Sequence, residues 1–402
     1  MSDINKNPIS KSSILSYGVF LFSVSIVLLC SVSIIFPALI QSTTSEFSEL
    51  PFYTPVVDPF ELGGLAIPFV IINGIILLIA VIYYKKYYSL SRLFEFDISN
   101  KIAIIVIVII LSIYIVVTIE EFSIEESWYD LTYVQDTVKH WGVDDLQRFD
   151  VHVKNFFLYL SINLFDNIRV IPFMASIALL ITTFFITKEI TKKRVPGILA
   201  MVIVLQSNIF LSYDTSATYS NFWVLFYVLS LYLILRKWQL SQVSFVLSIF
   251  SKLFSVMFLP MTIFFILNNT NGKKRIYITI SYGVLMILGL FAASNLDILF
   301  VDEQYMPENF TKGIETFSYQ LRFDPIILIS LLPLSVMLFL KSLKGFSQAN
   351  SIQVLILGFL LIPPLLITFT QQTNEPYRLI PLVIFFAIGV GTLLGKIKQD
   401  ES

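Results

Sequence analysis

Long apolar runs separated by short polar segments make up most of the chain. A membrane-spanning helix needs about 20 consecutive apolar residues, and ten runs come close to that length or exceed it. They are residues 14–40, 63–84, 101–119, 168–187, 196–212, 217–235, 276–294, 325–340, 351–370 and 378–395. This pattern predicts an all-α polytopic membrane protein.

The stretch 241–269 differs from the other runs because it is too long for one spanning helix and short for two. Lys252 and Pro260 interrupt it, so we expect a bent helical hairpin, which brings the predicted number of transmembrane helices to about 12. The first run follows Lys6 and Lys11 and is too long for the core of a signal peptide. It therefore predicts a signal anchor that is retained.

The composition excludes several classes of protein. Hydrophobic residues make up 56% of the chain and charged residues 14%, against roughly 45–50% and 25% in soluble proteins. The 37 Phe and 19 Tyr residues exclude a disordered or collagen-like chain, and the net charge of −1 argues against a nucleic-acid partner. The single cysteine, Cys30, rules out an intrachain disulfide.

The distribution of charge predicts the orientation in the membrane. With the N-terminus placed in the cytoplasm, the cytoplasmic side holds 19 of the 27 basic residues and only six of the 28 acidic ones. Positively charged loops remain in the cytoplasm, so we expect both termini there and two long acidic loops, 120–154 and 295–324, outside. This topology requires that 241–269 return to the cytoplasm.

The first outer loop carries the candidate chemistry. It contains nine acidic residues, both histidines of the protein and several aromatic residues, followed by the apolar segment 155–165, which is short enough to lie on the membrane. A carboxylate at the outer mouth of a span is placed to act as a general base on a lipid-linked substrate. The candidates are Glu121, Glu125, Glu126 and Asp130; the alternative is a solvated acidic loop without catalytic function.

Several segments, in a shared order, resemble the GT-C superfamily of membrane glycosyltransferases, of the protein mannosyltransferase and aminoarabinose transferase type. They are Glu125-Glu126-Ser127-Trp128-Tyr129, His152 with the apolar segment after it, the span that follows Arg169, the turn 212–222, the interrupted stretch with Lys252, and Glu375-Pro376-Tyr377-Arg378 before Pro381. The similarity covers most of 118–395. It departs from the family at the base position, where the family usually has Asp and this chain offers Glu125 and Glu126, or the neighbours Glu121 and Asp130. Val153 and Lys154 also replace the two prolines of the family.

The resemblance implies a division of the chain and a reaction. Residues 1–100 would form an extra N-terminal transmembrane hairpin and a cytoplasmic loop, and 101–402 a GT-C-like transmembrane domain. A sugar would pass from a polyprenyl-phosphate donor to an acceptor outside the cell, presumed to be at the plasma membrane, with one loop carboxylate as general base. Arg378 or Lys252 would hold the lipid phosphate. Tyr129, His152 and Asp214 would contact substrate.

Other interpretations remain open on the sequence alone. A multi-pass transporter would place its polar groups within broken helices near the midplane, and a non-catalytic subunit would use the acidic loop to bind another protein. His140 and His152, with Glu125 or Glu126, could hold a divalent metal, but their spacing matches no helical ligand motif. We therefore expect no cofactor. The sequence does not identify the sugar or the acceptor.

Overall fold

The computed structural model describes residues 11–37, 39, 58, 60–85, 96–124, 126–128, 130–142, 151–295, 309–310, 313–314, 321, 324–369 and 376–395. Over these residues the chain is helical, without a β-strand. The principal helices are α1 (Lys11–Ile35), α3 (Ala66–Lys85), α5 (Asn100–Thr118), α6 (Leu131–His140), α7 (His152–Phe165), α8 (Val170–Thr191), α9 (Val195–Val204), α10 (Asn208–Tyr213), α11 (Phe222–Arg236), α12 (Ser241–Ser251), α13 (Leu259–Asn269), α14 (Gly272–Asn295), α16 (Pro325–Leu343), α17 (Gln348–Phe369) and α18 (Ile380–Leu393). Short 3-10 segments are η3 (Ile119–Ser123), η5 (Trp238–Leu240), η6 (Leu253–Phe258) and η7 (Pro376–Leu379).

Five segments of the described chain are long and apolar enough to cross a membrane: Ile14–Val32, Asn100–Ser123, Val170–Thr191, Pro325–Leu343 and Pro376–Leu393. Further apolar helices of 10–17 residues accompany them. This confirms the prediction of an all-helical integral membrane protein. The finer prediction of about 12 spans with both termini in the cytoplasm stays a prediction.

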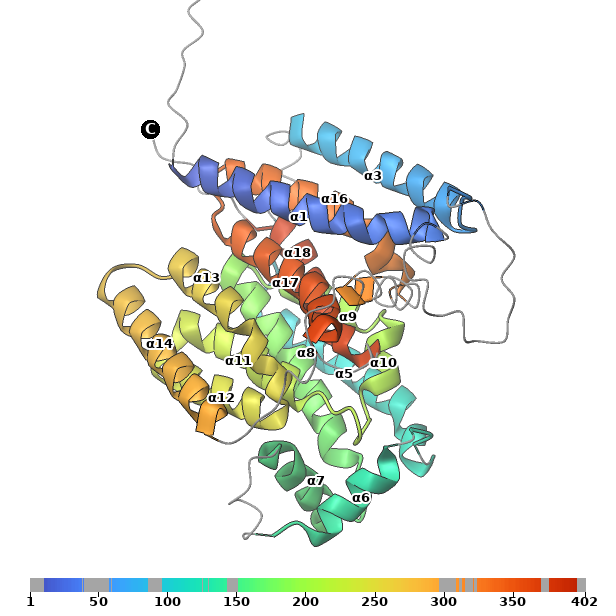
Figure 1. Cartoon of the computed structure of the whole chain (residues 1–402), viewed down its shortest axis with the longest axis vertical. Coiled ribbons are helices and arrows are strands. Elements are labelled where there is room, and N and C mark those ends of the chain that lie inside the picture. Colours follow the sequence, from blue (N-terminus) through green and yellow to red (C-terminus); the bar gives the residue numbers. More distant parts are fainter. Residues whose placement is uncertain are drawn as a thin grey trace, which may run out of the picture.

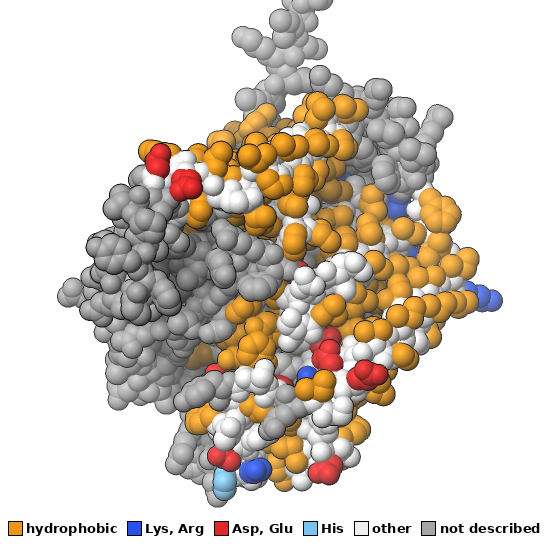
Figure 2. All heavy atoms as spheres, turned by 90° about the vertical axis from the view of Figure 1, so that its right-hand side faces the viewer, with side chains coloured by type: hydrophobic (Ala, Val, Ile, Leu, Met, Phe, Trp, Pro, Cys, Tyr) orange, Lys and Arg blue, Asp and Glu red, His pale blue; other side chains and the backbone are white. Residues whose placement is uncertain are grey.

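The spanning helices differ in how much protein surrounds them. Within its most apolar window, 83% of the Pro376–Leu393 segment is buried, against 17% for Asn100–Ser123. A helix that is apolar all round is stable in the protein core or in lipid. The segment containing α18 is therefore central, whereas α5 leaves most of its apolar residues exposed. Figure 2 shows hydrophobic side chains spread over much of the face that it draws.

Aromatic side chains fill the centre of the bundle. Trp223 and Tyr227 on α11 are fully buried, and the Tyr227 ring lies 5.0 Å from that of Phe258. Phe359 on α17 stacks on Phe385 on α18 with 5.2 Å between ring centroids. Large buried rings of this kind contribute more apolar contact area than any other side chains, so they fix α11, α17 and α18 against each other.

The N-terminal helices cover the C-terminal part of the chain. Figure 1 shows α1 and α3 beside α16, at the end of the molecule opposite α6 and α7. Phe20 of α1 stacks on Phe339 of α16 at 4.0 Å, and Asn350 of α17 donates a buried hydrogen bond of 2.9 Å to Ser16. These contacts of α1 thus join residues more than 300 positions apart in sequence.

Two apolar runs fold differently from the simplest prediction, and a third follows its prediction at Lys252 but not at Pro260. The run 196–212 is interrupted after Val204, because Asp324 accepts hydrogen bonds from Ser207 Oγ at 2.7 Å and from the Asn208 amide at 2.8 Å, which starts α10 as a separate helix. The run 217–235 becomes helical only at Phe222. The stretch 241–269 is interrupted at Lys252, whose backbone is extended, as predicted; Pro260 lies in the first turn of α13, where its missing amide hydrogen costs nothing.

Candidate functional site

The turn 214–221 between α10 and α11 organises the site. Asp214, the first residue of this turn, is 1% exposed. Its carboxylate accepts a hydrogen bond of 2.6 Å from Tyr114 Oη of α5, and its carbonyl accepts one of 2.6 Å from Ser176 Oγ of α8. Burial raises the pKa of Asp214 to about 7, and the Tyr114 hydrogen bond opposes that rise. The start of the turn is therefore fixed to two of the spanning segments.

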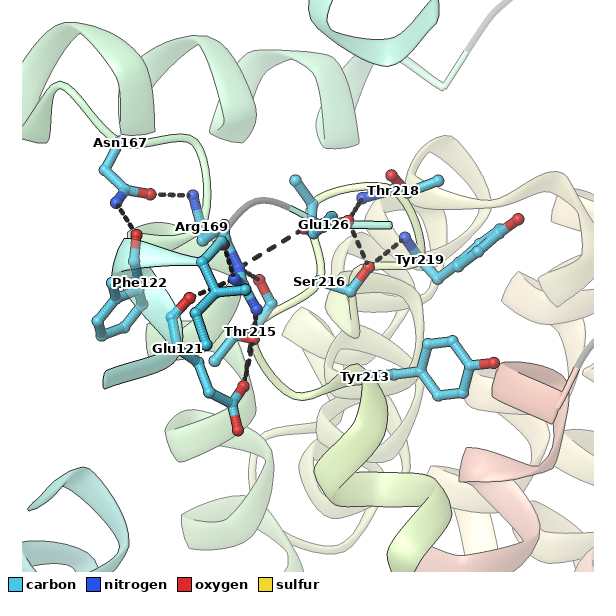
Figure 3. Close-up of polar contacts among 12 residues, drawn as sticks. Glu121, Phe122, Glu126, Asn167, Arg169, Tyr213, Thr215, Ser216, Thr218 and Tyr219 are labelled. Carbon is cyan, nitrogen blue, oxygen red and sulfur yellow. Dashed lines mark hydrogen bonds and ion pairs between the residues drawn. The ribbon is translucent and has the colours of Figure 1, made fainter. Parts of the chain in front are cut away.

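Arg169 is the residue immediately before α8, and its guanidinium group contacts two neighbouring segments of the chain (Figure 3). It donates to the carbonyl oxygens of Glu121 and Ile124 and to Thr215 Oγ1. It also lies 3.6 Å from a carboxylate oxygen of Glu121 and 3.8 Å from one of Glu126. We name Glu121, Glu126, Arg169 and Thr215 the Arg169 cluster. A guanidinium has five N–H donors in a fixed plane, which suits it to hold η3 and the turn 214–221 together.

Within this cluster the two glutamates are in different environments. The Glu126 side chain is 3% exposed, and it accepts hydrogen bonds from Ser216 Oγ at 3.1 Å and from the backbone amides of Ala217 and Thr218. Successive backbone amides of this kind form a site for an anion. The Glu121 side chain is 43% exposed and accepts a hydrogen bond of 2.9 Å from Thr215 Oγ1. Glu126 thus stabilises the turn, whereas Glu121 remains partly open.

Four aromatic side chains lie beside the Arg169 cluster; we name Trp128, Tyr213, Tyr219 and Tyr377 the aromatic group. Trp128 stacks on Tyr213 at 5.0 Å, and Tyr219 stacks on Tyr377 at 4.4 Å. Tyr213 contacts both Tyr219 and Tyr377 edge to face. Tyr219 Oη also donates a hydrogen bond of 3.1 Å to the carboxylate of Asp130. Asp130 is exposed and lies at the start of α6. The group therefore joins the acidic loop after α5 to the segment before α18.

Two cationic side chains lie close to Tyr377 of the aromatic group. Lys252 Nζ is 3.7 Å from the centre of the Tyr377 ring and 5.6 Å from that of Trp223. The Arg378 guanidinium carbon lies 5.8 Å from the centre of the Tyr377 ring and 6.0 Å from that of Phe254, and the residue is only 6% exposed. Both cations, predicted separately from sequence, therefore contact the same tyrosine.

A pocket of about 380 Å³ is lined in part by Glu126 and Arg169 of the Arg169 cluster. Its walls come from η3, α6 and the connection between α7 and α8, and they combine apolar with charged side chains. The lining residues are Phe122, Ser123, Ile124, Glu126, Leu131, Gln135, Lys139, Ile162, Asp166, Asn167, Ile168 and Arg169. A pocket of this volume is large enough for part of a small ligand.

The remaining predicted residues fall in several places. Glu125 and Tyr129 lie outside the described residues. His152 begins α7, and two residues later Lys154 Nζ donates a hydrogen bond of 2.6 Å to the Thr218 carbonyl, which fixes α7 to the turn. The part of the chain that the structure describes contains no group of three or more His, Cys, Asp or Glu residues that could hold a metal ion.

Sequence reasoning missed the role of Arg169 and of Tyr377. In the sequence, Arg169 stands only as the residue before a span, although a lone cation close to an acidic loop indicates an ion pair. Tyr377 lies next to Arg378, but nothing in its sequence position indicates that Tyr219 and Lys252 contact its ring. Comparison of the chain with protein-family models, curated proteins and solved structures finds no match.

Proposed function

We propose that the chain is a membrane glycosyltransferase of the GT-C type, which transfers a sugar from a polyprenyl phosphate to an acceptor hydroxyl on the outer face of the membrane. One observation carries the proposal: Asp130, Lys252 and Arg378 all contact members of one aromatic group. The segments involved lie more than 100 residues apart in sequence. Such a reaction needs a base on one side of the anomeric carbon and positive charge on the other.

Lys252 and Arg378 would bind the phosphate of the donor. The bond between the acceptor oxygen and the anomeric carbon forms while the bond from that carbon to the phosphate oxygen breaks. The leaving polyprenyl phosphate keeps the electron pair, so negative charge grows on it in the transition state. Two cations next to the Tyr377 ring stabilise that charge, and the guanidinium of Arg378 can contact two phosphate oxygens at once.

Among the described carboxylates, Asp130 is best placed to accept the proton of the acceptor hydroxyl. It is exposed, and Tyr219 connects it to the aromatic group that the cations contact. The oxygens of Glu126 already accept hydrogen bonds from the turn, which leaves that residue to position the loop. By its resemblance to the GT-C superfamily, Glu125 is also a candidate for the base, so it is tested together with Asp130.

The test is sugar transfer by the purified chain in lipid nanodiscs, with a radiolabelled polyprenyl-phosphate sugar and candidate acceptors. We expect Asp130→Asn to lower turnover by about 10²–10⁴ while donor binding is kept. Asp136→Asn is the matched control, because Asp136 is an exposed aspartate on the same helix. Glu125→Gln and Glu126→Gln, assayed in parallel, identify the base if Asp130 is dispensable.

Donor binding tests the phosphate site separately from the base. Loss of a charge-assisted contact costs about 1.5–3 kcal/mol, so Arg378→Ala should weaken donor binding roughly ten- to a hundredfold. Arg378→Lys keeps the charge but loses the planar guanidinium group, so its donor affinity should lie between those of the natural chain and of Arg378→Ala. Full donor affinity in Arg378→Ala and in Lys252→Ala, together with full transfer in every carboxylate variant, would contradict the proposal and favour a transporter or a non-catalytic subunit.

A further inference from the structure

A second group of cations lies where α11 ends and α14 begins, at the end of α11 away from the turn 214–221, and the proposed reaction does not use it. It comprises Arg236, Lys237, Lys273, Lys274 and Arg275. Lys274 Nζ donates a hydrogen bond of 3.3 Å to the Leu235 carbonyl, so the two helix ends are adjacent. Five cations therefore gather at a single end of the bundle.

Few acidic residues balance this charge. The sequence from Phe222 to Asn295 contains no Asp or Glu. The ion pair that involves the group is Arg236 with Glu189 of α8 at 2.6 Å, and Glu189 also pairs with Lys192. Lys237 and Lys273 are exposed residues. The end of α11 and the start of α14 thus present a net positive surface.

An aromatic pair and an apolar face lie directly beside these cations. Trp238 of η5 stacks on Tyr277 of α14 with ring planes 10° apart. Beyond Tyr277, α14 exposes Ile280, Ile287 and Phe291 along its length. Trp and Tyr are enriched at the level of lipid headgroups, with cations on the water side and apolar residues on the hydrocarbon side. The order cation, aromatic pair, apolar face matches that arrangement.

We propose that this end of α11 and α14 binds an anionic phospholipid, with the phosphate at Lys237 and Lys273 and the acyl chains along the exposed face of α14. A lipid headgroup and a free phosphate ion would offer the same phosphate group to the two lysines. The apolar face distinguishes the two sources, because only a lipid covers Ile280, Ile287 and Phe291 while its phosphate contacts the lysines. The inference is independent of the proposed glycosyl transfer.

The experiment measures lipid retention by the purified full chain with native mass spectrometry, using phosphatidylglycerol and phosphatidylcholine as competing probes. We expect phosphatidylglycerol to be retained preferentially. Each lysine near a membrane surface changes the affinity for anionic lipid by about fivefold, so Lys237→Gln combined with Lys273→Gln should weaken retention about 25-fold. Lys101→Gln combined with Lys344→Gln removes the same charge elsewhere and should leave retention unchanged.

Two soluble probes distinguish the sources of the phosphate. Glycerophosphoglycerol, which has the headgroup without acyl chains, and inorganic phosphate should both compete weakly with phosphatidylglycerol. Equal retention of the two lipids, an equal effect of the two double variants, or full displacement by either soluble probe would overturn the proposal.

Discussion

Asp214 offers the sharpest test of how the turn 214–221 is held. The carboxyl group is buried against Tyr114, and burial raises its pKa from the ordinary value of 3.8 to about 7. Between these two pH values the folded chain keeps a proton that the unfolded chain has released. Stability therefore falls as the pH rises from about 4 to about 7 and is level above that. A gap of about three pH units corresponds to about 4 kcal/mol as an upper limit.

Asp214→Asn has no titrating group at this position, so it should remove that pH dependence and be no less stable than the natural chain at pH 8. Tyr114→Phe removes the hydrogen bond that lowers the pKa, so its stability should continue to fall above pH 7. The assay is thermal unfolding in detergent, followed by tryptophan fluorescence from pH 4 to pH 9, with shifts of several degrees expected. A uniform loss of stability at every pH in Asp214→Asn would refute the reasoning.

Three further substitutions test packing and caps. Asp97→Ala removes the acceptor for the first amides of α9 and the 2.8 Å ion pair with Arg194, so unfolding should show a loss of about 1–2 kcal/mol relative to Asp97→Asn. Lys341→Met should cost about 2–3 kcal/mol in the same assay, because the ammonium group donates to three backbone carbonyls at the end of α18. Gly391→Ala places a methyl carbon 2.8 Å from a backbone oxygen of α9 and should cost about 1–3 kcal/mol, whereas Gly389→Ala meets only side chains at 3.2 Å or more and should be milder.

The fold was predictable where hydropathy alone decides it. Apolar runs of spanning length predicted the helices because a backbone in lipid must satisfy its own hydrogen bonds. The start of α10 was not predictable, because Asp324 supplies the cap for Asn208 from 116 residues away. The delayed start of α11 has a similar origin, since Asn221 and Asp214 use their polar groups to bind α8 before the helix begins.

The candidate site was predictable in its residue types and less so in their roles. The acidic loop, Lys252 and Arg378 stood out because charge is rare in this chain, and the structure brings Asp130, Lys252 and Arg378 to one aromatic group. The burial of Glu126 was hidden, because its hydrogen-bond donors are backbone amides of a turn 91 residues away. Backbone donors leave no signal in the side-chain sequence.

The polar contacts divide the residues of the site into two sets: those that hold the loops in place, and those that would contact substrate. Arg169 and Glu126 form hydrogen bonds with backbone groups of η3, of Ile124 and of the turn. Truncating either side chain would leave buried polar atoms without partners. Asp130 is exposed, and the cations contact aromatic rings. Substitutions in the first set should therefore lower the amount of folded protein, and substitutions in the second set should lower activity at unchanged stability. Because the turn 214–221 touches both sets, a change in Asp214 reaches the reacting groups only through the geometry of that turn.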